Sequence, residues 1–208
     1  LDKTTSTATI TISAATFSLS LDRTQYPTAD RIITVYVTVE DPDANILSTA
    51  IETITIGDDT AKGEEIKVYD AAGAVVYDYV ASVGTLTLTE TGPNTGVFTA
   101  SFTINQATIP SPASWLNAKL KVVYYSPAAD EKATATATFV NSDIAIALSQ
   151  TTAKYGDDVT VTVTYPDANL DSKTRELFTI TYDYTNPAGT LITNIPLTLT
   201  ETGPNTGV

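Results

Sequence analysis

The sequence contains the same octapeptide twice, and this repeat limits the possible folds more than any other feature. The residues Glu-Thr-Gly-Pro-Asn-Thr-Gly-Val occupy positions 90–97 and again positions 201–208. In both places they follow the sequence Leu-Thr-Leu-Thr, at 86–89 and 197–200. An identical octapeptide in the same local context is too long a match to arise by chance. The chain therefore contains two copies of one structural unit.

Two further matches occur in the same order along the chain. Pro-Asp-Ala-Asn occupies 42–45 and 166–169, each time after an alternating Val/Thr run. The pattern Thr-Ala-Thr-x-Thr of 7–11 recurs at 134–138. The copies are therefore similar along most of their length, with shorter loops in the second.

These matches divide the chain into three segments. Residues 14–141 are predicted to form one complete unit, and residues 1–13 correspond to the last strand of a preceding unit. Residues 142–208 stop before the counterparts of roughly three strands, which would leave an open core and unpaired sheet edges. We expect either that the sequence is a window on a longer array, or that strands from another chain complete the second unit.

Threonine alternates with apolar residues through much of the chain, for example at 33–39 and 159–164. A period of two places one residue type on each face of a sheet, and β-branched threonine suits the solvated face. Asp-Pro, Gly-Asp and Asn-Pro pairs separate the runs at spacings typical of β-sandwiches. No segment has the apolar spacing of an amphipathic helix over three turns. We predict an all-β fold.

The composition excludes several classes of function. The chain has no His, Cys or Met, which rules out His-dependent and Cys-dependent nucleophiles, zinc sites with His or Cys ligands, and disulfides. A formal net charge of −13 argues against binding to nucleic acid or to anionic lipid. No apolar run approaches the roughly 20 residues that span a bilayer. The acids form no recognisable catalytic pair, so we expect no enzyme activity.

The repeated motifs resemble a module of known surface proteins. The residues that carry the resemblance are 41–45 and 88–98 in the first copy and 166–169 and 199–208 in the second. They are similar to tandem immunoglobulin-like modules of archaeal surface-layer and filament proteins, and of some bacterial surface proteins. The resemblance implies an extracellular role in the cell envelope, self-assembly through contacts between modules, and commonly calcium dependence. The second copy departs from the pattern, because Tyr165 replaces the first Asp.

Oxygen ligands suit hard cations such as calcium, and one loop in each copy concentrates them. Asp41, Asp43 and Asn45 lie at alternate positions, a spacing that can wrap a calcium ion. Asp and Asn in such loops also form Asx turns without any ion, and this alternative stays open. The second copy offers a shifted set: Asp167, Asn169 and Asp171. Further ligands are expected among more distant acids, namely Asp30, Asp58, Asp59, Asp157 and Asp158.

The octapeptide itself consists mostly of residues that shape the backbone. Gly92 and Gly96 allow positive φ, Pro93 fixes φ, and Asn94 tolerates the left-handed region. We therefore predict a structural turn between two strands. Glu90 and Glu201, the first residues of the two copies, are also candidates for binding a metal ion or a neighbouring domain.

The placement of the aromatic residues distinguishes a structural protein from a carbohydrate-binding one. Trp115 is predicted to close one end of the sandwich, and Tyr77, Tyr79, Tyr124 and Tyr125 to pack in strands. An exposed aromatic strip would instead favour carbohydrate binding. We expect a structural subunit of a cell-surface layer or extracellular filament, with acidic loops at the module junctions that calcium stiffens. The alternative is an adhesin or a carbohydrate-binding module.

Overall fold

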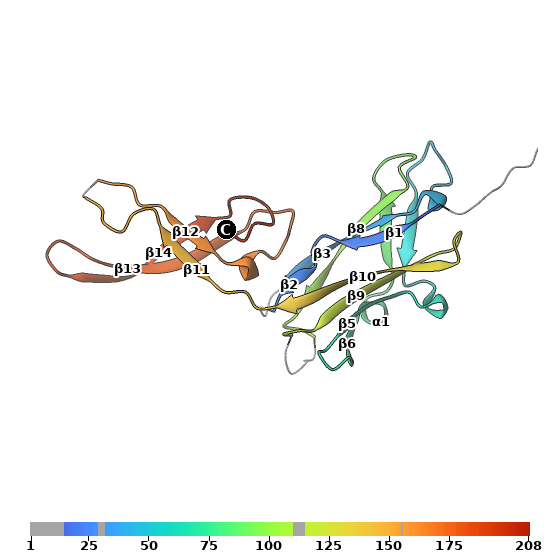
Figure 1. Cartoon of the computed structure of the whole chain (residues 1–208), viewed down its shortest axis with the longest axis horizontal. Helices are drawn as coiled ribbons and strands as arrows, with labels where there is room; N and C mark the ends of the chain where they lie inside the picture. The colour runs from blue at the N-terminus through green and yellow to red at the C-terminus, as the bar shows by residue number, and fades with distance from the viewer. Residues whose placement is uncertain (1–14, 29–31, 110–114, 155) are drawn as a thin grey trace, which may run out of the picture.

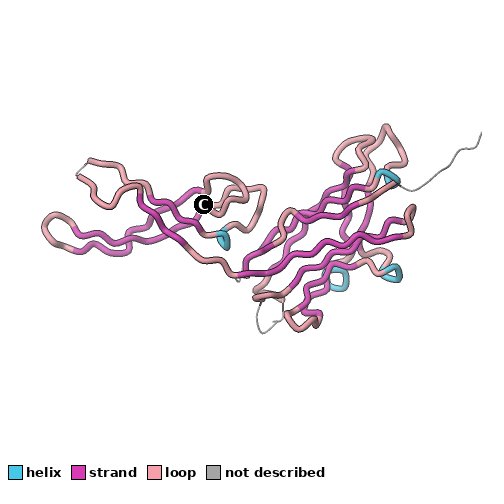
Figure 2. The backbone as a smooth tube through the Cα atoms, viewed as in Figure 1, coloured by secondary structure: helices cyan, strands magenta, loops and turns pink. Residues whose placement is uncertain are grey.

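The residues that the computed structural model describes are 15–28, 32–109, 115–154 and 156–208. Strands joined by loops make up almost all of this structure, which confirms the prediction of an all-β fold (Figures 1 and 2). The strands form two groups, which we call the first module (residues 15–140) and the second module (residues 142–208). The strand expected over residues 1–13 lies outside the described residues.

One layer of the first module is a five-stranded antiparallel sheet with β3 and β8 near its centre. These two strands pair along their whole lengths, from Ile32↔Asn105 to Glu40↔Val97. The spatial order of the strands is β1 (Ser18–Leu21), β3 (Ile32–Glu40), β8 (Val97–Asn105), β7 (Leu86–Glu90) and β4 (Thr53–Ile56).

The other layer is a second five-stranded sheet. Its strands are, in spatial order, β2 (Gln25–Pro27), β10 (Glu131–Val140), β9 (Lys119–Ser126), β5 (Glu65–Tyr69) and β6 (Val75–Asp78). The short strand β2 runs parallel to β10, and the other pairs are antiparallel. Two facing sheets of this kind are consistent with the immunoglobulin-like sandwich that the resemblance implies.

The core lies between the two sheets because apolar residues alternate along the strands. The inward residues of β3 are Ile33, Val35, Val37 and Val39, and all four are fully buried. Phe98 on β8 is also fully buried. The intervening β3 residues are partly exposed or at the surface, as the period of two predicts.

Trp115 is half-buried and packs edge-on against Phe139, with 4.9 Å between the ring centroids. This tryptophan therefore packs against the core of the sandwich, and its closing one end of the sandwich stays a prediction. Tyr77, Tyr124 and Tyr125 lie in strands as predicted, whereas the prediction for Tyr79 is wrong.

Tyr79 begins the single helical turn α1 (Tyr79–Ser82). The turn forms because the side chain of Asp78 accepts a hydrogen bond from the Ala81 N–H at 3.1 Å, which caps its first residues. Two 3₁₀ turns, η1 (Pro42–Ala44) and η2 (Thr60–Lys62), also connect strands of the first module. No helix in the described part of the chain is long and apolar enough to cross a membrane.

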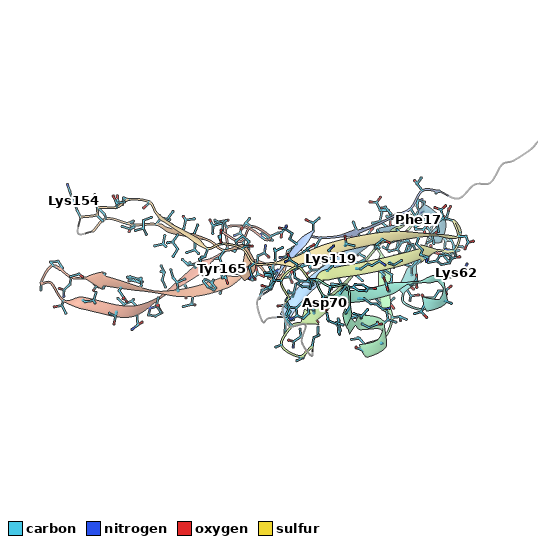
Figure 3. The ribbon with its side chains drawn as sticks, turned by 60° about the horizontal axis from the view of Figure 1, so that its bottom comes forward. Phe17, Lys62, Asp70, Lys119, Lys154 and Tyr165 are labelled. Carbon is cyan, nitrogen blue, oxygen red and sulfur yellow. The ribbon has the colours of Figure 1, made fainter. Side chains whose placement is uncertain are left out.

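The second module consists of two separate antiparallel pairs and not of two facing sheets. Among its described residues, Val163 is the one buried apolar side chain, while Ile146, Leu177 and Leu191 are exposed. In Figure 3 its side chains project from narrow ribbons, whereas those of the first module gather between two layers. Its elements are β11 (Ala145–Leu148), β12 (Val161–Thr164), η3 (Pro166–Ala168), β13 (Leu177–Thr185) and β14 (Leu191–Thr200).

Candidate functional site

The two repeated motifs, which lie some fifty residues apart in the sequence, pack against each other in the first module. The Asp41 N–H donates to the Gly96 carbonyl at 2.8 Å, and the Asn45 side-chain amide donates to Asn94 Oδ1 at 3.0 Å. We call this contact between the 41–45 loop and the 90–97 turn the motif clasp. It fixes where the chain enters β8.

A buried carboxylate closes the turn of the clasp. Glu90 Oε1 accepts hydrogen bonds from the N–H groups of Thr95 at 2.8 Å and Gly96 at 2.9 Å. Burial by itself raises the pKa of Glu90, but the backbone donors outweigh it and lower the pKa below its ordinary value. The structural role predicted for the octapeptide is therefore confirmed, and the carboxylate of its first residue is the group that closes the turn.

The glycines of the octapeptide have different roles. Gly96 has φ +62°, and a Cβ there would lie 2.9 Å from the Pro42 Cα, so the left-handed backbone and the close approach both require glycine. Asn94 has φ 63°, as expected from its tolerance of this region. Gly92 does not have a positive φ, so the prediction that it supplies one is wrong.

The second module builds the same clasp from its own copy of the motifs. The Tyr165 N–H donates to the Gly207 carbonyl at 2.7 Å, and the Asn169 amide donates to Asn205 Oδ1 at 3.2 Å. Glu201 Oε1 accepts from the Gly207 N–H at 2.7 Å, and Glu201 is only 8% exposed. The clasp therefore forms in both modules, although their cores differ.

A second glutamate in each module holds the acidic loop, and sequence analysis missed it. Glu52 accepts from the Ile46 and Leu47 N–H groups at 2.7 and 3.1 Å. Glu176 accepts from the N–H groups of residues 170 and 171, both through Oε1. The signal was present, because 176 − 52 = 124 is also the offset between the two Pro-Asp-Ala-Asn motifs.

The first predicted calcium loop directs its side chains to different partners. Asp41 Oδ1 accepts from the Asp43 N–H at 3.1 Å and caps η1, while Oδ2 accepts from the Tyr124 hydroxyl at 2.8 Å. Burial, and then the bond to Asp41, raise the pKa of Tyr124 far above its ordinary value. Asp43 Oδ2 accepts from the Ala15 N–H at 2.6 Å. The Asx-turn interpretation of this loop is therefore correct, and calcium binding remains a prediction.

Beside this loop lies an open cavity of about 390 Å³, which we call the acidic cavity. Its lining contains no lysine or arginine but carries five carboxylates, from Asp41, Asp43, Asp58, Asp59 and Glu64. Two of the more distant acids considered from the sequence, Asp58 and Asp59, are thus brought to the predicted loop. Asp30 lies outside the described residues, and Asp157 and Asp158 belong to the second module.

Glu64 is the most constrained acid of this cavity. Its Oε2 accepts from the Gly57 N–H at 2.8 Å, and its Oε1 accepts from the Tyr125 N–H at 3.1 Å. Burial raises its pKa, and a hydrogen bond shared with Asp58 raises it further, against the effect of the backbone donors. Within the described residues, no group of three or more His, Cys, Asp or Glu side chains is arranged to hold a metal ion as the cavity stands.

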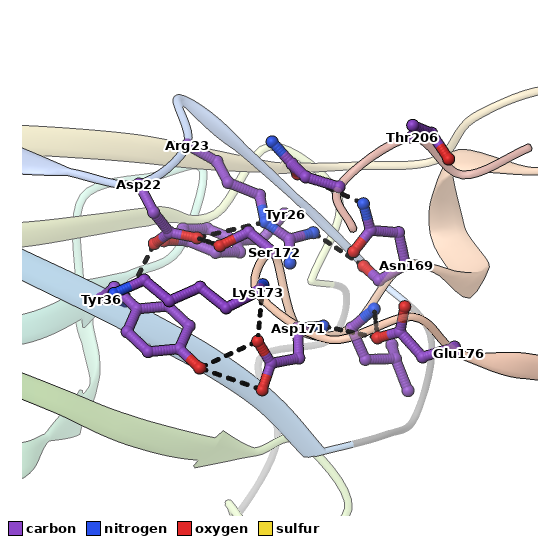
Figure 4. A network of polar contacts seen from close by, with 12 residues as sticks. Asp22, Arg23, Tyr26, Tyr36, Asn169, Asp171, Ser172, Lys173, Glu176 and Thr206 are labelled. Atoms are coloured by element: carbon purple, nitrogen blue, oxygen red, sulfur yellow. Dashed lines mark hydrogen bonds and ion pairs between the residues drawn. The ribbon is translucent and has the colours of Figure 1, made fainter. Parts of the chain in front are cut away.

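The second predicted calcium loop forms the junction between the modules (Figure 4). The Arg23 guanidinium donates to the Asn169 carbonyl at 2.7 Å, and the Tyr36 hydroxyl donates to Asp171 at 2.9 and 3.1 Å. Asp167 lies on the other side of the loop, where its Oδ2 accepts from the Ser142 N–H at 3.1 Å. The three predicted ligands therefore bond to three separate segments.

Asp22 is the central acceptor of the junction on the first module. It accepts from the hydroxyl of Ser172 at 2.5 Å, from the hydroxyl of Tyr26 at 2.7 Å and from the Tyr36 N–H at 2.9 Å. The Lys173 ammonium lies 4.0 Å from the centroid of the Tyr36 ring. The Ser172 hydroxyl and the Lys173 ammonium belong to the second module, so these two contacts join the modules.

Sequence analysis did not identify Asp22, Arg23 or Tyr36 as junction residues. At the repeat offsets of 127 and 124 their counterparts are Ser149, Gln150 and Thr160, so the junction residues differ between the copies. A residue that differs between the two copies could have been noted as a candidate for a role specific to one module. The difference alone does not show which surface such a residue contacts.

Comparison with known proteins identifies a family for this chain. No curated protein matches the chain. The SlaA-like family, described as S-layer A-like, matches residues 34–190, which is more than half of the chain and spans both modules. This family suggests a structural role in a surface layer and a location at the cell surface. Because the match covers more than half of its length, the chain belongs to the SlaA-like, S-layer A-like family.

Proposed function

We propose that the chain is a structural part of a self-assembling surface layer on the outside of the cell, built from modules in tandem. The junction is the observation that carries this proposal. A backbone bond from the Thr34 N–H to the Leu170 carbonyl at 3.1 Å accompanies the side-chain bonds around Asp22. A junction with both backbone and side-chain bonds fixes the angle between modules, which a lattice or a filament of repeated modules requires.

The buried acids support a structural role over a catalytic one. Asp41, Glu90 and Glu201 are all nearly buried, and each accepts hydrogen bonds that hold a turn or join two segments. Because buried polar groups in folded proteins are normally hydrogen-bonded, these contacts are accounted for by the fold itself. The packing of Trp115 and Tyr124 inside the first module gives no support to the alternative of a carbohydrate platform.

The location and the assembly have a direct test. Antibodies raised against the chain should label the surface of intact source cells, and the extracted envelope should contain the chain in ordered sheets or filaments under the electron microscope. Labelling only after the cells are broken open would contradict the proposal. The shape of the extracted assembly distinguishes a lattice from a filament.

Calcium binding at the acidic loops is the second part of the proposal. The carboxylates of the acidic cavity repel one another when they are all ionised, because no basic residue lines it. Burial and the neighbouring Asp58 carboxyl raise the pKa of Glu64, as expected where carboxylates crowd together. A calcium ion would offset this repulsion with its positive charge and would bind several oxygen ligands.

Neutral oxygens complete the candidate ligand set. Ser126 is 1% exposed and lines the acidic cavity, and its Oγ has no hydrogen-bond partner among the described atoms. Asn45 Oδ1 and Asn169 Oδ1 are buried and equally without a partner. In the second module the proposed ligands are the predicted Asp167, Asn169 and Asp171.

Calorimetry and thermal unfolding test the calcium proposal. Calcium should raise the melting temperature of the full chain at pH 7, because it binds the folded cavity and not the unfolded chain. Asp58→Asn should remove most of this shift. Asp143→Asn, which removes one charge from an exposed position outside the cavity, should leave it intact. Equal calcium responses in the two variants would exclude the acidic cavity as the site.

The pH dependence gives an independent check. Because the folded-state pKa of Glu64 is raised, its contribution to stability is present below the ordinary glutamate pKa of about 4.3. That contribution is lost as the pH rises through the raised value. Saturating calcium should abolish this loss, whereas an unchanged pH profile in calcium would count against a shared site.

A further inference from the structure

The two outer faces of the first module differ in charge. On the sheet that contains β5, β6 and β9, the Lys67 and Lys121 ammonium groups lie 3.3 and 2.7 Å from the Glu65 carboxylate. Lys67 also lies 3.5 Å from Asp78 on the edge strand β6. Charged side chains therefore pair with one another across the outer face of this sheet.

The outer face of the other sheet carries hydroxyl side chains instead. One row of them crosses all five strands, because adjacent strands pair Ser20 with Thr38, Thr38 with Thr99, Thr99 with Thr89, and Thr89 with Thr53. We call the surface around this row the hydroxyl face. Among the outward residues of its five strands, all in the described part of the chain, Glu40 at the end of β3 is the one charged residue.

The distribution of charge favours this face as a contact between copies of the chain. The net charge is −13, so two copies repel each other over most of their surface. The centres of protein interfaces are depleted of charged residues. A hydroxyl group can both donate and accept a hydrogen bond, so a surface of hydroxyls is complementary to itself. Two hydroxyl faces can therefore meet with little repulsion.

The hydroxyl face is continuous with an interface that the chain already forms. Tyr36 lies opposite Ser101 on the outward side of the same sheet. Its hydroxyl donates to Asp171 of the second module at 2.9 Å. Thr53 and Thr89, in the strands farther from this contact, are exposed. The junction thus covers one end of the sheet face and leaves the row of hydroxyls open.

The size of the face suits a weak contact that is repeated many times. Five strands about 4.8 Å apart span about 19 Å, and the nine residues of β3 or β8 span about 30 Å. The resulting area of about 600 Å² per copy is below the roughly 800 Å² per partner of a standard interface. Such a contact is weak in a pair and becomes stable when each copy makes several contacts.

We propose that the hydroxyl face binds the hydroxyl face of a second copy of the chain, with the two copies related by a two-fold axis. Each copy then contributes the same residues to the contact. The hydroxyls exchange hydrogen bonds across it, and the acidic surfaces of both copies stay outside it. This inference names the partner and the surface for the proposed self-assembly, and it rests on that proposed function.

Sedimentation of the full chain at several concentrations and salt levels tests the proposal. Dimers should form as the concentration rises, and salt should make them more abundant because it screens the repulsion between the acidic surfaces. Association that salt weakens would assign the contact to ion pairs with the lysines of the other sheet, and would overturn the proposal. A chain that stays monomeric at the highest soluble concentration would also overturn it.

Matched variants locate the contact. Thr99→Glu places a carboxylate in the middle of the row, and the two-fold axis brings two of them together, so the dissociation constant should rise about 10-fold or more. Thr134→Glu adds the same charge at an exposed position of β10 in the other sheet and should leave the dissociation constant unchanged.

Circular dichroism checks that the variants fold, and Thr89→Glu at an exposed position of the same row provides a second test of the face. Equal dissociation constants in the hydroxyl-face variants and in Thr134→Glu would overturn the inference. The labelling of intact cells tests the proposed function separately, so a surface protein whose hydroxyl face makes no contact is distinguished from a chain that is not at the surface.

Discussion

The two modules share their motifs and their clasp but differ in their cores. Glu90 and Glu201 make the same bonds to the turn that follows them. The inward side chains of β3 are all fully buried, whereas on β12 Val163 is buried and Val161 is only half-buried. The clasp is local, since it needs one loop and one turn. A closed core needs strands from the rest of a module, so the motifs can form without it.

The one departure in the repeated motif changes the contacts of its first residue. Asp41 is buried and accepts a hydrogen bond from the Tyr124 hydroxyl on β9. Tyr165 stands at the equivalent position and packs edge-on against Phe178, with 5.7 Å between the ring centroids.

The largest expected difference in stability is between substitutions of the second leucine in each Leu-Thr-Leu-Thr strand, Leu88 and Leu199. Leu88→Ala should lower the free energy of unfolding by about 2–5 kcal/mol, because it leaves a cavity in a closed core. Leu199→Ala should cost about 1 kcal/mol or less, since the half-buried side chain loses few contacts. Urea unfolding of the full chain measures both. Equal losses would show that the second core is closed in solution.

A smaller effect is expected at the clasp glycine. Gly96→Ala should destabilise the first module by about 1–3 kcal/mol, because it strains a left-handed residue and drives a Cβ against the Pro42 backbone. Gly92→Ala is the matched control, since its Cβ would meet only the Thr95 side chain at an ordinary 3.5 Å. A loss at Gly92 as large as that at Gly96 would contradict the packing of the clasp.

The acid dependence of the clasp is a subtler test. The folded-state pKa of Glu90 is lowered, so its stabilising contribution is present above the ordinary glutamate pKa of about 4.3 and is lost as the pH falls through the lower value. The stability difference between the chain and Glu90→Gln should therefore shrink on acidification. Urea titrations from neutral to acidic pH measure it, with the exposed Glu131→Gln as control. A constant difference would argue against an ionised Glu90.

The smallest effect is expected at the junction. Tyr36→Phe removes the bond to Asp171 and should cost about 0.5–1.5 kcal/mol, with faster hydrogen exchange in the 170–173 loop. Tyr69→Phe is the control, because it removes a similar bond to Glu65 inside the first module and should leave the loop unchanged. If the loop exchanges at the same rate in both variants, the bond does not hold the modules together.

The sequence determined the local structure. The alternation of threonine with apolar residues predicted strands because side chains on a strand point to opposite faces in turn. The octapeptide predicted its turn because Gly96 and Asn94 tolerate backbone angles that other residues avoid. Both inferences depend only on neighbours in the chain, and so did the Asx turn that Asp41 forms.

Only the tertiary structure decided which distant residues meet. It brought the two motifs of each module into one clasp, placed Asp58 and Glu64 beside Asp41, and directed Asp171 to Tyr36 in the other module. Such contacts depend on how the sheets pack and on where loops of different length end, and no periodicity in the sequence encodes these. Repeated residues identify what the modules share, but the bonds between modules come from residues that do not repeat.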